Sequence, residues 1–187
     1  MRPSIAIAPL RMNPESRPNA ALLGPDILTA IKASGIEFVV SVPDIVTSEG
    51  LLRPISRDPE LRHIRLCKED EGVSICAALS YCNRRALLMM QQTGMYDSIN
   101  AIRAIAVDYG HPVCMLIGLQ GAEPDVPPRQ SPKHIVRVAE PLLDALGLTH
   151  HLLRTAADVA KIRPAIDDAY ARSRPVALLV GAMLPPA

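Results

Sequence analysis

The stretch CKEDEGVSICAALSYCNRRALLMMQQTG, residues 67–94, decides the fold. Its first half predicts a helix from Glu69 to about Cys82, because acidic residues in a first helical turn complement the helix dipole. Its second half contains ALLMMQQ, residues 86–92, which begins with an unbroken apolar run. A strand that is apolar on both faces is typical of a parallel sheet with helices on each side.

The same alternation of helix and strand extends in both directions from this stretch. Apolar strands are also expected at 36–42, 63–67, 112–118, 149–154 and 175–181. Helices are expected at about 25–34, 48–55, 97–109, 141–148 and 155–170, with a kink or break at Pro164. Gly35 and Gly110 should each end a helix in the left-handed conformation. The pattern predicts a three-layer α/β domain with a mostly parallel six-stranded sheet.

Composition excludes several classes of function. The 187 residues include 20 Lys plus Arg and 19 Asp plus Glu, a balance that argues against a nucleic-acid partner. No apolar window is long enough to span a membrane, and the apolar stretch near the N-terminus is too short for a signal peptide. We therefore expect a cytoplasmic protein. The four cysteines form no CxxC pair and have no close histidine, so no metal site is expected.

The chain is expected to consist of one domain preceded by an extension. Residues 1–20 are rich in Pro, Arg, Asn and Ser and show no sustained period, which favours a flexible arm or a partner contact. Residues 21–187 contain the whole alternating pattern and form the predicted domain.

Candidate functional residues follow the predicted strands, because ligands bind parallel sheets beyond the carboxyl ends of the strands. These positions include Asp44, residues 68–72, residues 92–94 and residues 119–121. No loop matches GxGxxG, GxxxxGK[ST] or GxSxG, so a self-contained nucleotide fold and a hydrolase nucleophile elbow are both unsupported.

The acidic run Glu69-Asp70-Glu71 allows two interpretations. In the first interpretation, each acid stabilises the helix by about 0.3–1 kcal/mol through its interaction with the helix dipole, and the run has no ligand. Alternatively, one carboxyl lies in a dry crevice beside the small-residue helix face, where its pKa would rise and it could exchange a proton with a ligand nitrogen.

Three segments in order carry a family resemblance: residues 67–81, residues 86–105 and YGHPVCMLIG, residues 109–118. They resemble the pyrimidine-binding domain of thiamine diphosphate (ThDP) decarboxylases, and more narrowly the sulfopyruvate and phosphonopyruvate decarboxylases. The matching motifs are Glu71-Gly72, Met90–Gly94, Ser98–Ala101 and Val42-Pro43-Asp44. The similarity runs from about Pro25 to Gly181.

The resemblance implies a mechanism. A glutamate hydrogen-bonds the pyrimidine nitrogen N1′ of ThDP and favours the tautomer that removes the thiazolium C2 proton, after which a 2-oxo acid loses CO₂. The resemblance assigns this role to Glu71, with Glu69 as the alternative. Asp44 would face the reacting carbon as a proton relay or substrate contact. The residues expected to line the pyrimidine or the substrate are Gln91, Gln92, Thr93 and Gly94.

A missing motif implies a partner. ThDP enzymes hold the diphosphate through Mg²⁺ with a GDG motif, and this chain contains none. The chain therefore resembles half an active site. The resemblance implies a stand-alone α subunit in a hetero-oligomer, in which a separate β subunit carries the GDG motif and the Mg²⁺.

Departures from the family pattern leave the substrate and the activity open. Relatives have Asn at the positions of Gln92 and Asp97, and His-Arg-Gly in place of Leu119–Gly121. Arg129, Lys133 and His134 are candidates to bind a small anionic 2-oxo acid, or they belong to a solvated loop. Two alternative functions follow: a non-catalytic scaffold or regulatory homologue, or half of another ThDP-dependent carboligase.

Overall fold

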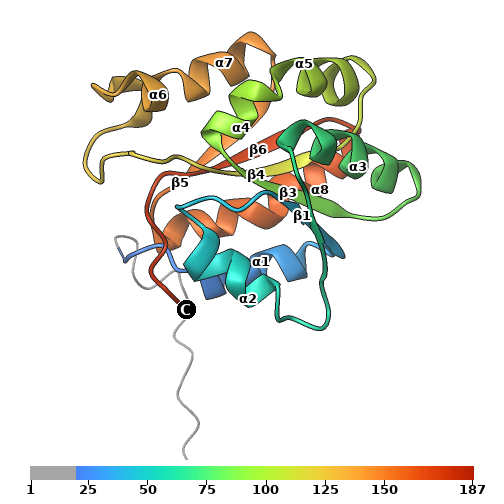
Figure 1. Cartoon of the computed structure of the whole chain (residues 1–187), viewed down its shortest axis with the longest axis horizontal. Coiled ribbons are helices and arrows are strands. Elements are labelled where there is room, and N and C mark those ends of the chain that lie inside the picture. The colour runs from blue at the N-terminus through green and yellow to red at the C-terminus, as the bar shows by residue number, and fades with distance from the viewer. Residues whose placement is uncertain (1–19) are drawn as a thin grey trace, which may run out of the picture.

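The computed structural model describes residues 20–187 and contains a six-stranded, all-parallel sheet with the strand order β2-β1-β3-β4-β6-β5 (Figure 1). The strands are β1 (Phe38–Ser41), β2 (Arg62–Arg65), β3 (Ala86–Gln91), β4 (Cys114–Gly118), β5 (Thr149–Leu153) and β6 (Val176–Val180). The predicted fold class is confirmed. The extension predicted at residues 1–20 lies outside the described residues, apart from Ala20.

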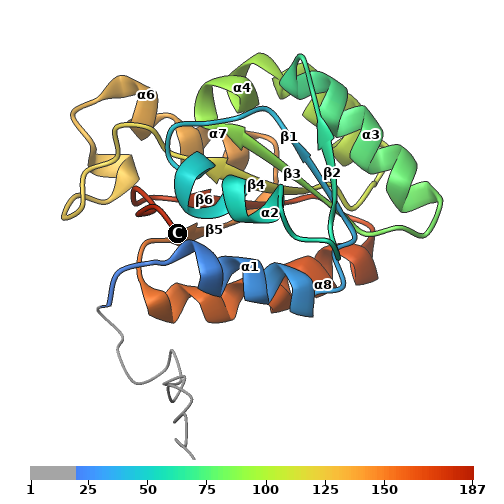
Figure 2. The same cartoon turned by 60° about the horizontal axis from the view of Figure 1, so that its bottom comes forward.

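Helices cover both faces of the sheet (Figure 2). Figure 2 shows α1 and α8 beneath the sheet and α3, α4 and α7 above it. The α-helices are α1 (Gly24–Ala33), α2 (Arg53–Ile55), α3 (Glu69–Tyr81), α4 (Gln92–Asp97), α5 (Ile99–Ala101), α6 (His134–Arg137), α7 (Ala139–Ala145) and α8 (Ile162–Arg172). Two π-helical segments (Ser48–Leu52 and Ile102–Asp108) and two 3₁₀ segments (Pro128–Gln130 and Ala156–Lys161) complete the set.

Strand β3 shows why its sequence is apolar throughout. Leu87 and Met89 are fully buried in the core shared with α1 and α8, whereas Leu88 and Met90 are fully buried in the core shared with α3 and α4. Successive side chains of a strand point to opposite faces, so a strand between two helical layers needs apolar residues at every position.

The largest departure from the expected elements lies at residues 92–109. The strand expected to include Gln92 ends at Gln91, and α4 begins at Gln92 instead of at about residue 97. The helix is then interrupted at Ser98, whose backbone (φ −95°, ψ 3°) is not helical. Helical periodicity did not reveal this start, because Thr93 and Gly94 are weak helix formers. The predicted left-handed stops at Gly35 (φ +71°) and Gly110 (φ +67°) are confirmed.

The break predicted at Pro164 is also confirmed. A 3₁₀ segment ends at Lys161 and α8 begins at Ile162, which places Pro164 in the first turn of α8. Proline is tolerated there because the backbone N–H groups of a first turn have no helical partner. Among residues 20–187, no helix is long and apolar enough to cross a membrane.

Candidate active site at the carboxyl edge of the sheet

The carboxyl ends of β1 to β4 bring four segments together. These are the loop after β1, the start of α3 after β2, the start of α4 after β3, and residues 119–121 after β4. The first turns of α3 and α4 are neighbours, because these two helices pack against each other. The candidate residues of this edge thus come from separate parts of the sequence.

Glu69 is the first residue of α3, and its half-buried side chain lies against Gly94 of α4. A β-carbon added to Gly94 would overlap with the Cγ, Cδ and Oε1 atoms of Glu69. Glycine at residue 94 therefore forms the notch that accommodates this carboxyl group. Within residues 20–187, no side chain or backbone group forms a hydrogen bond or ion pair with the Glu69 carboxylate.

Glu71 has a different position. Its exposed side chain turns back along the helix, and Oε2 accepts hydrogen bonds from the backbone N–H groups of Cys67 and Lys68, both at 3.3 Å. This contact belongs to the capping box at the start of α3. Asp70 faces Lys68, with 3.6 Å between Oδ2 and Nζ. The three acids of the run thus differ in what they contact.

Asp44 is almost completely buried, with 5% of its surface exposed. Oδ1 accepts hydrogen bonds from the backbone N–H groups of Val46 (2.7 Å) and Thr47 (3.0 Å), and Oδ2 accepts one from the Thr47 hydroxyl. Burial raises the pKa of the Asp44 carboxyl above its ordinary value. A β-carbon at Gly118 would overlap with Asp44, so this side chain reaches from the end of β1 to the end of β4.

Gln92 is fully buried, and both ends of its amide bind the backbone of Gln120. Nε2 donates to the carbonyl of Gln120 at 2.8 Å, and Oε1 accepts from the N–H of Gln120 at 2.9 Å. Its neighbours Gln91 and Thr93 lie nearer the surface and bind each other at 2.8 Å. Gln92 thus fixes the segment that follows β4, whereas Gln91 and Thr93 are accessible to a ligand.

The three cations predicted to bind the substrate differ in their contacts. Arg129 forms ion pairs with Asp144 (2.7 Å) and Glu140 (3.6 Å) on α7. His134 begins α6 and is exposed. Only Lys133 reaches the segment after β4, where Nζ donates to the carbonyl of Gly121 at 2.6 Å.

Sequence reasoning missed Glu123, whose carboxylate binds Lys133 and Ser131. The available signal was an acid in the polar loop after β4. Within the described part of the chain, no group of three or more His, Cys, Asp or Glu side chains could hold a metal ion.

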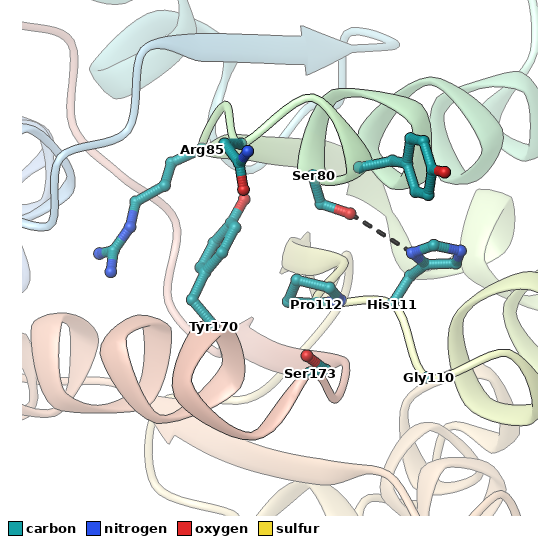
Figure 3. A pocket seen from close by; sticks show the side chains of 9 residues that line it. Ser80, Arg85, Gly110, His111, Pro112, Tyr170 and Ser173 are labelled. Carbon is teal, nitrogen blue, oxygen red and sulfur yellow. Dashed lines mark hydrogen bonds between the residues drawn. The ribbon is translucent and has the colours of Figure 1, made fainter.

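A separate cavity of about 470 Å³ opens among residues at the amino ends of β3 and β4 (Figure 3). Ser80 and His111 form part of its wall, with 3.5 Å between Oγ of Ser80 and Nδ1 of His111. The guanidinium of Arg85 points away from the cavity. None of the predicted site residues lines this cavity.

Known proteins resemble the chain over most of its length. The α subunit of sulfopyruvate decarboxylase from Methanocaldococcus jannaschii is 32% identical over 158 residues, which cover 84% of this chain and 92% of that protein. The chain belongs to the family of sulfopyruvate decarboxylase α subunits. The corresponding subunit from Methanococcus maripaludis is 28% identical over 158 residues, which cover 84% of this chain and 93% of that protein. No protein-family model matches the chain.

Membership of the sulfopyruvate decarboxylase α-subunit family makes this chain a decarboxylase subunit, and the name α subunit implies a second subunit. One relative has a different length. The protein from Methanosarcina acetivorans named sulfopyruvate decarboxylase is 27% identical over 158 residues, which cover 82% of this chain but 38% of that protein. The family thus includes a chain more than twice as long, whose name mentions no subunit.

Proposed function

We propose that this chain is the α subunit of a ThDP-dependent decarboxylase that removes CO₂ from sulfopyruvate or a closely similar anionic 2-oxo acid. The family assignment supports the reaction. The single observation that carries the cofactor proposal is the position of the Glu69 carboxyl group. Its carboxyl group is half-buried, has no partner among residues 20–187, and lies in the notch at Gly94.

This geometry suits a carboxyl group that must bind a pyrimidine nitrogen. A partly desolvated carboxyl with no other partner can form a short, strong hydrogen bond to a ligand. Bound ThDP would supply the electron sink for loss of CO₂. The chain would contribute Glu69 at N1′ of the pyrimidine, with Gln91 and Thr93 beside it.

We assign this role to Glu69 and not to Glu71. One carboxylate oxygen of Glu71 already accepts two backbone N–H groups at the start of α3. A ligand could recruit Glu71 only by opening the capping box, which costs about 0.5–2 kcal/mol. Glu69 needs no such rearrangement.

Asp44 acts in this proposal as a positioning residue. Among residues 20–187, the hydrogen bonds that its carboxylate accepts all come from its own turn, at Val46 and Thr47. The side chain therefore fixes the loop after β1 against Gly118. The backbone of this loop, rather than the buried carboxylate, would face the substrate.

We further propose that a β subunit completes the site by holding the diphosphate and Mg²⁺ through a GDG motif. Two observations support this division. The 187 residues contain no GDG sequence. The matched region is 38% of the Methanosarcina acetivorans relative, so most of that longer chain lies outside it and has room for a second half-site.

Co-expression with a candidate GDG-bearing β subunit tests the function. We expect CO₂ release from sulfopyruvate that saturates with ThDP and requires Mg²⁺, and none from either subunit alone. Product analysis separates release of the aldehyde from its ligation. A complex that is neither stabilised by ThDP nor active would identify a scaffold and contradict the proposal.

A further inference from the structure

The carboxylate of Glu123 occupies an arrangement of donors suited to an anion. Its Oε1 lies 3.1 Å from Nζ of Lys133, and its Oε2 accepts a 2.8 Å hydrogen bond from the hydroxyl of Ser131. These two donors lower the pKa of the Glu123 carboxyl, Ser131 contributing more than Lys133. A cation and a hydroxyl thus converge on one anionic group.

The donors are held in place by bonds that do not involve Glu123. Ser131 is a buried residue with 1% of its surface exposed, and its hydroxyl accepts the backbone N–H of Lys133 at 3.1 Å. The guanidinium of Arg137 donates to the carbonyl of Ser131 at 2.7 Å. The ammonium of Lys133 also donates to Gly121 at 2.6 Å. The arrangement therefore has supports of its own if the Glu123 carboxylate moves away.

This cluster is connected to the candidate active site. Gly121 follows Gln120, whose backbone is bound at both its N–H and its carbonyl by the buried side chain of Gln92. Gln92 begins α4, the helix whose Gly94 accommodates Glu69. Gly118, the last residue of β4, lies two residues before Gln120 and contacts the Asp44 side chain. Lys133 is thus attached to the carboxyl end of β4, the strand next to β3.

Other cations of the same region are committed elsewhere. Arg129 is paired with Asp144 and Glu140 on α7. The guanidinium of Arg154 donates to the backbone carbonyl of Glu123 at 3.1 Å and not to its carboxylate. The exchangeable partner of the Lys133 ammonium is the side chain of Glu123, which is 22% exposed.

We propose that Lys133 and Ser131 form the subsite for the anionic tail of the substrate, a sulfonate in the case of sulfopyruvate, and that Glu123 occupies this subsite until the substrate displaces it. The inference rests on the proposed function. A sulfonate offers oxygen acceptors to the same ammonium and hydroxyl donors that now bind a carboxylate. Glu123 then competes with the substrate and sets the affinity for its anionic tail.

Steady-state kinetics of the α–β complex with ThDP and Mg²⁺ test this proposal through two substrates. Sulfopyruvate carries the sulfonate, and pyruvate lacks it. We expect Lys133→Met to raise the KM for sulfopyruvate at least tenfold with kcat nearly unchanged and with the KM for pyruvate unaffected. Lys133→Arg should recover most of the affinity. Glu123→Gln should lower the KM for sulfopyruvate several-fold.

Arg129→Met is the matched control. It removes a cation from the same loop, but this cation forms its ion pairs with Glu140 and Asp144 on α7. It should leave the KM ratio of the two substrates unchanged. Equal effects of Lys133→Met on both substrates, or an increased KM for sulfopyruvate in Glu123→Gln, would overturn the proposal while leaving the decarboxylase activity intact.

A binding measurement separates this inference from the proposed function. Methanesulfonate should raise the melting temperature of the wild-type α–β complex, and should do so less in Lys133→Met. If the complex releases no CO₂ but this difference is observed, the anion subsite stands and the decarboxylase proposal fails. If methanesulfonate stabilises both proteins equally, or neither, the subsite is wrong.

Discussion

The carboxyl group of Glu69 and the backbone of Gly94 touch where the first turns of α3 and α4 meet. Any side chain at residue 94 would need the space that the Glu69 carboxyl fills. This contact joins the acidic run after β2 to the start of α4 after β3, two segments that are more than twenty residues apart in the sequence.

Gly94→Ala should displace the Glu69 carboxyl and reduce decarboxylase activity at least tenfold. Overpacking at a tight contact costs about 1–3 kcal/mol, so the variant should still fold if the wild type has ordinary stability. The measurement is kcat/KM of the α–β complex together with the melting temperature. In a Glu69→Gln background the same change should have little further effect on activity, and additive losses would show that Gly94 acts independently of Glu69.

Gln92→Leu should destabilise the chain by about 1–3 kcal/mol, because the two hydrogen bonds between the Gln92 amide and the backbone of Gln120 would be lost. Gln92→Asn should also destabilise it, because a side chain shorter by one methylene does not span the same gap. Urea denaturation measures both effects. Gln91→Ala is the control and should change stability by less than about 0.5 kcal/mol, because within the described residues the side chain of Gln91 bonds only that of exposed Thr93.

Asp44→Asn and Asp44→Ala should differ. The amide oxygen of Asn can still accept the N–H groups of Val46 and Thr47, so this variant should keep most of the activity and an unchanged pH profile. Alanine removes the acceptor and should lower both stability and activity. An equal loss of kcat in both variants, with a shifted pH profile in Asp44→Asn, would instead identify Asp44 as a proton relay.

The capping residue Asp158 should make stability fall in acid. Burial opposes its ionisation, but hydrogen bonds from Lys161, Thr155 and the backbone N–H groups of residues 154 and 155 outweigh burial and lower its pKa to about 2. The depressed pKa contributes stability that is complete above the unfolded pKa of 3.8 and is lost as pH falls toward 2.

Chemical denaturation between pH 5 and pH 2 checks this effect. Asp158→Asn should lower the free energy of unfolding at neutral pH by about 1–2 kcal/mol and flatten its decline in this window. If the difference in free energy of unfolding between wild type and Asp158→Asn stays constant from pH 5 to pH 2, the carboxylate charge of Asp158 plays no part in stability.

The sheet was predictable because each strand carries its own pattern. The apolar run at residues 86–90 needs no long-range information, since burial on both faces requires it. Elements at residues 92–109 were less predictable. Ser98 interrupts the helix in a buried position where tertiary packing, and not local propensity, decides the backbone.

The site was predictable as a set of segments but not as a set of contacts. Motif order brought the acidic run and the turn at residues 91–94 to one edge. It did not distinguish Glu69 from Glu71. These residues are two positions apart on α3, so their side chains leave the helix about 200° apart, and only one of them can face α4. The partner of Gln92 lies 28 residues away in the sequence, and no local pattern points to it.

The most direct test of the central claim compares Glu69→Gln with Glu71→Gln in the α–β complex, using calorimetry with ThDP and CO₂ release from sulfopyruvate. We expect Glu69→Gln to abolish CO₂ release and weaken ThDP binding. Glu71→Gln should keep both and nearly all of the stability, because the amide oxygen of glutamine can still accept the backbone N–H groups of Cys67 and Lys68. Full activity in Glu69→Gln would contradict the assignment of the pyrimidine-binding carboxyl to Glu69.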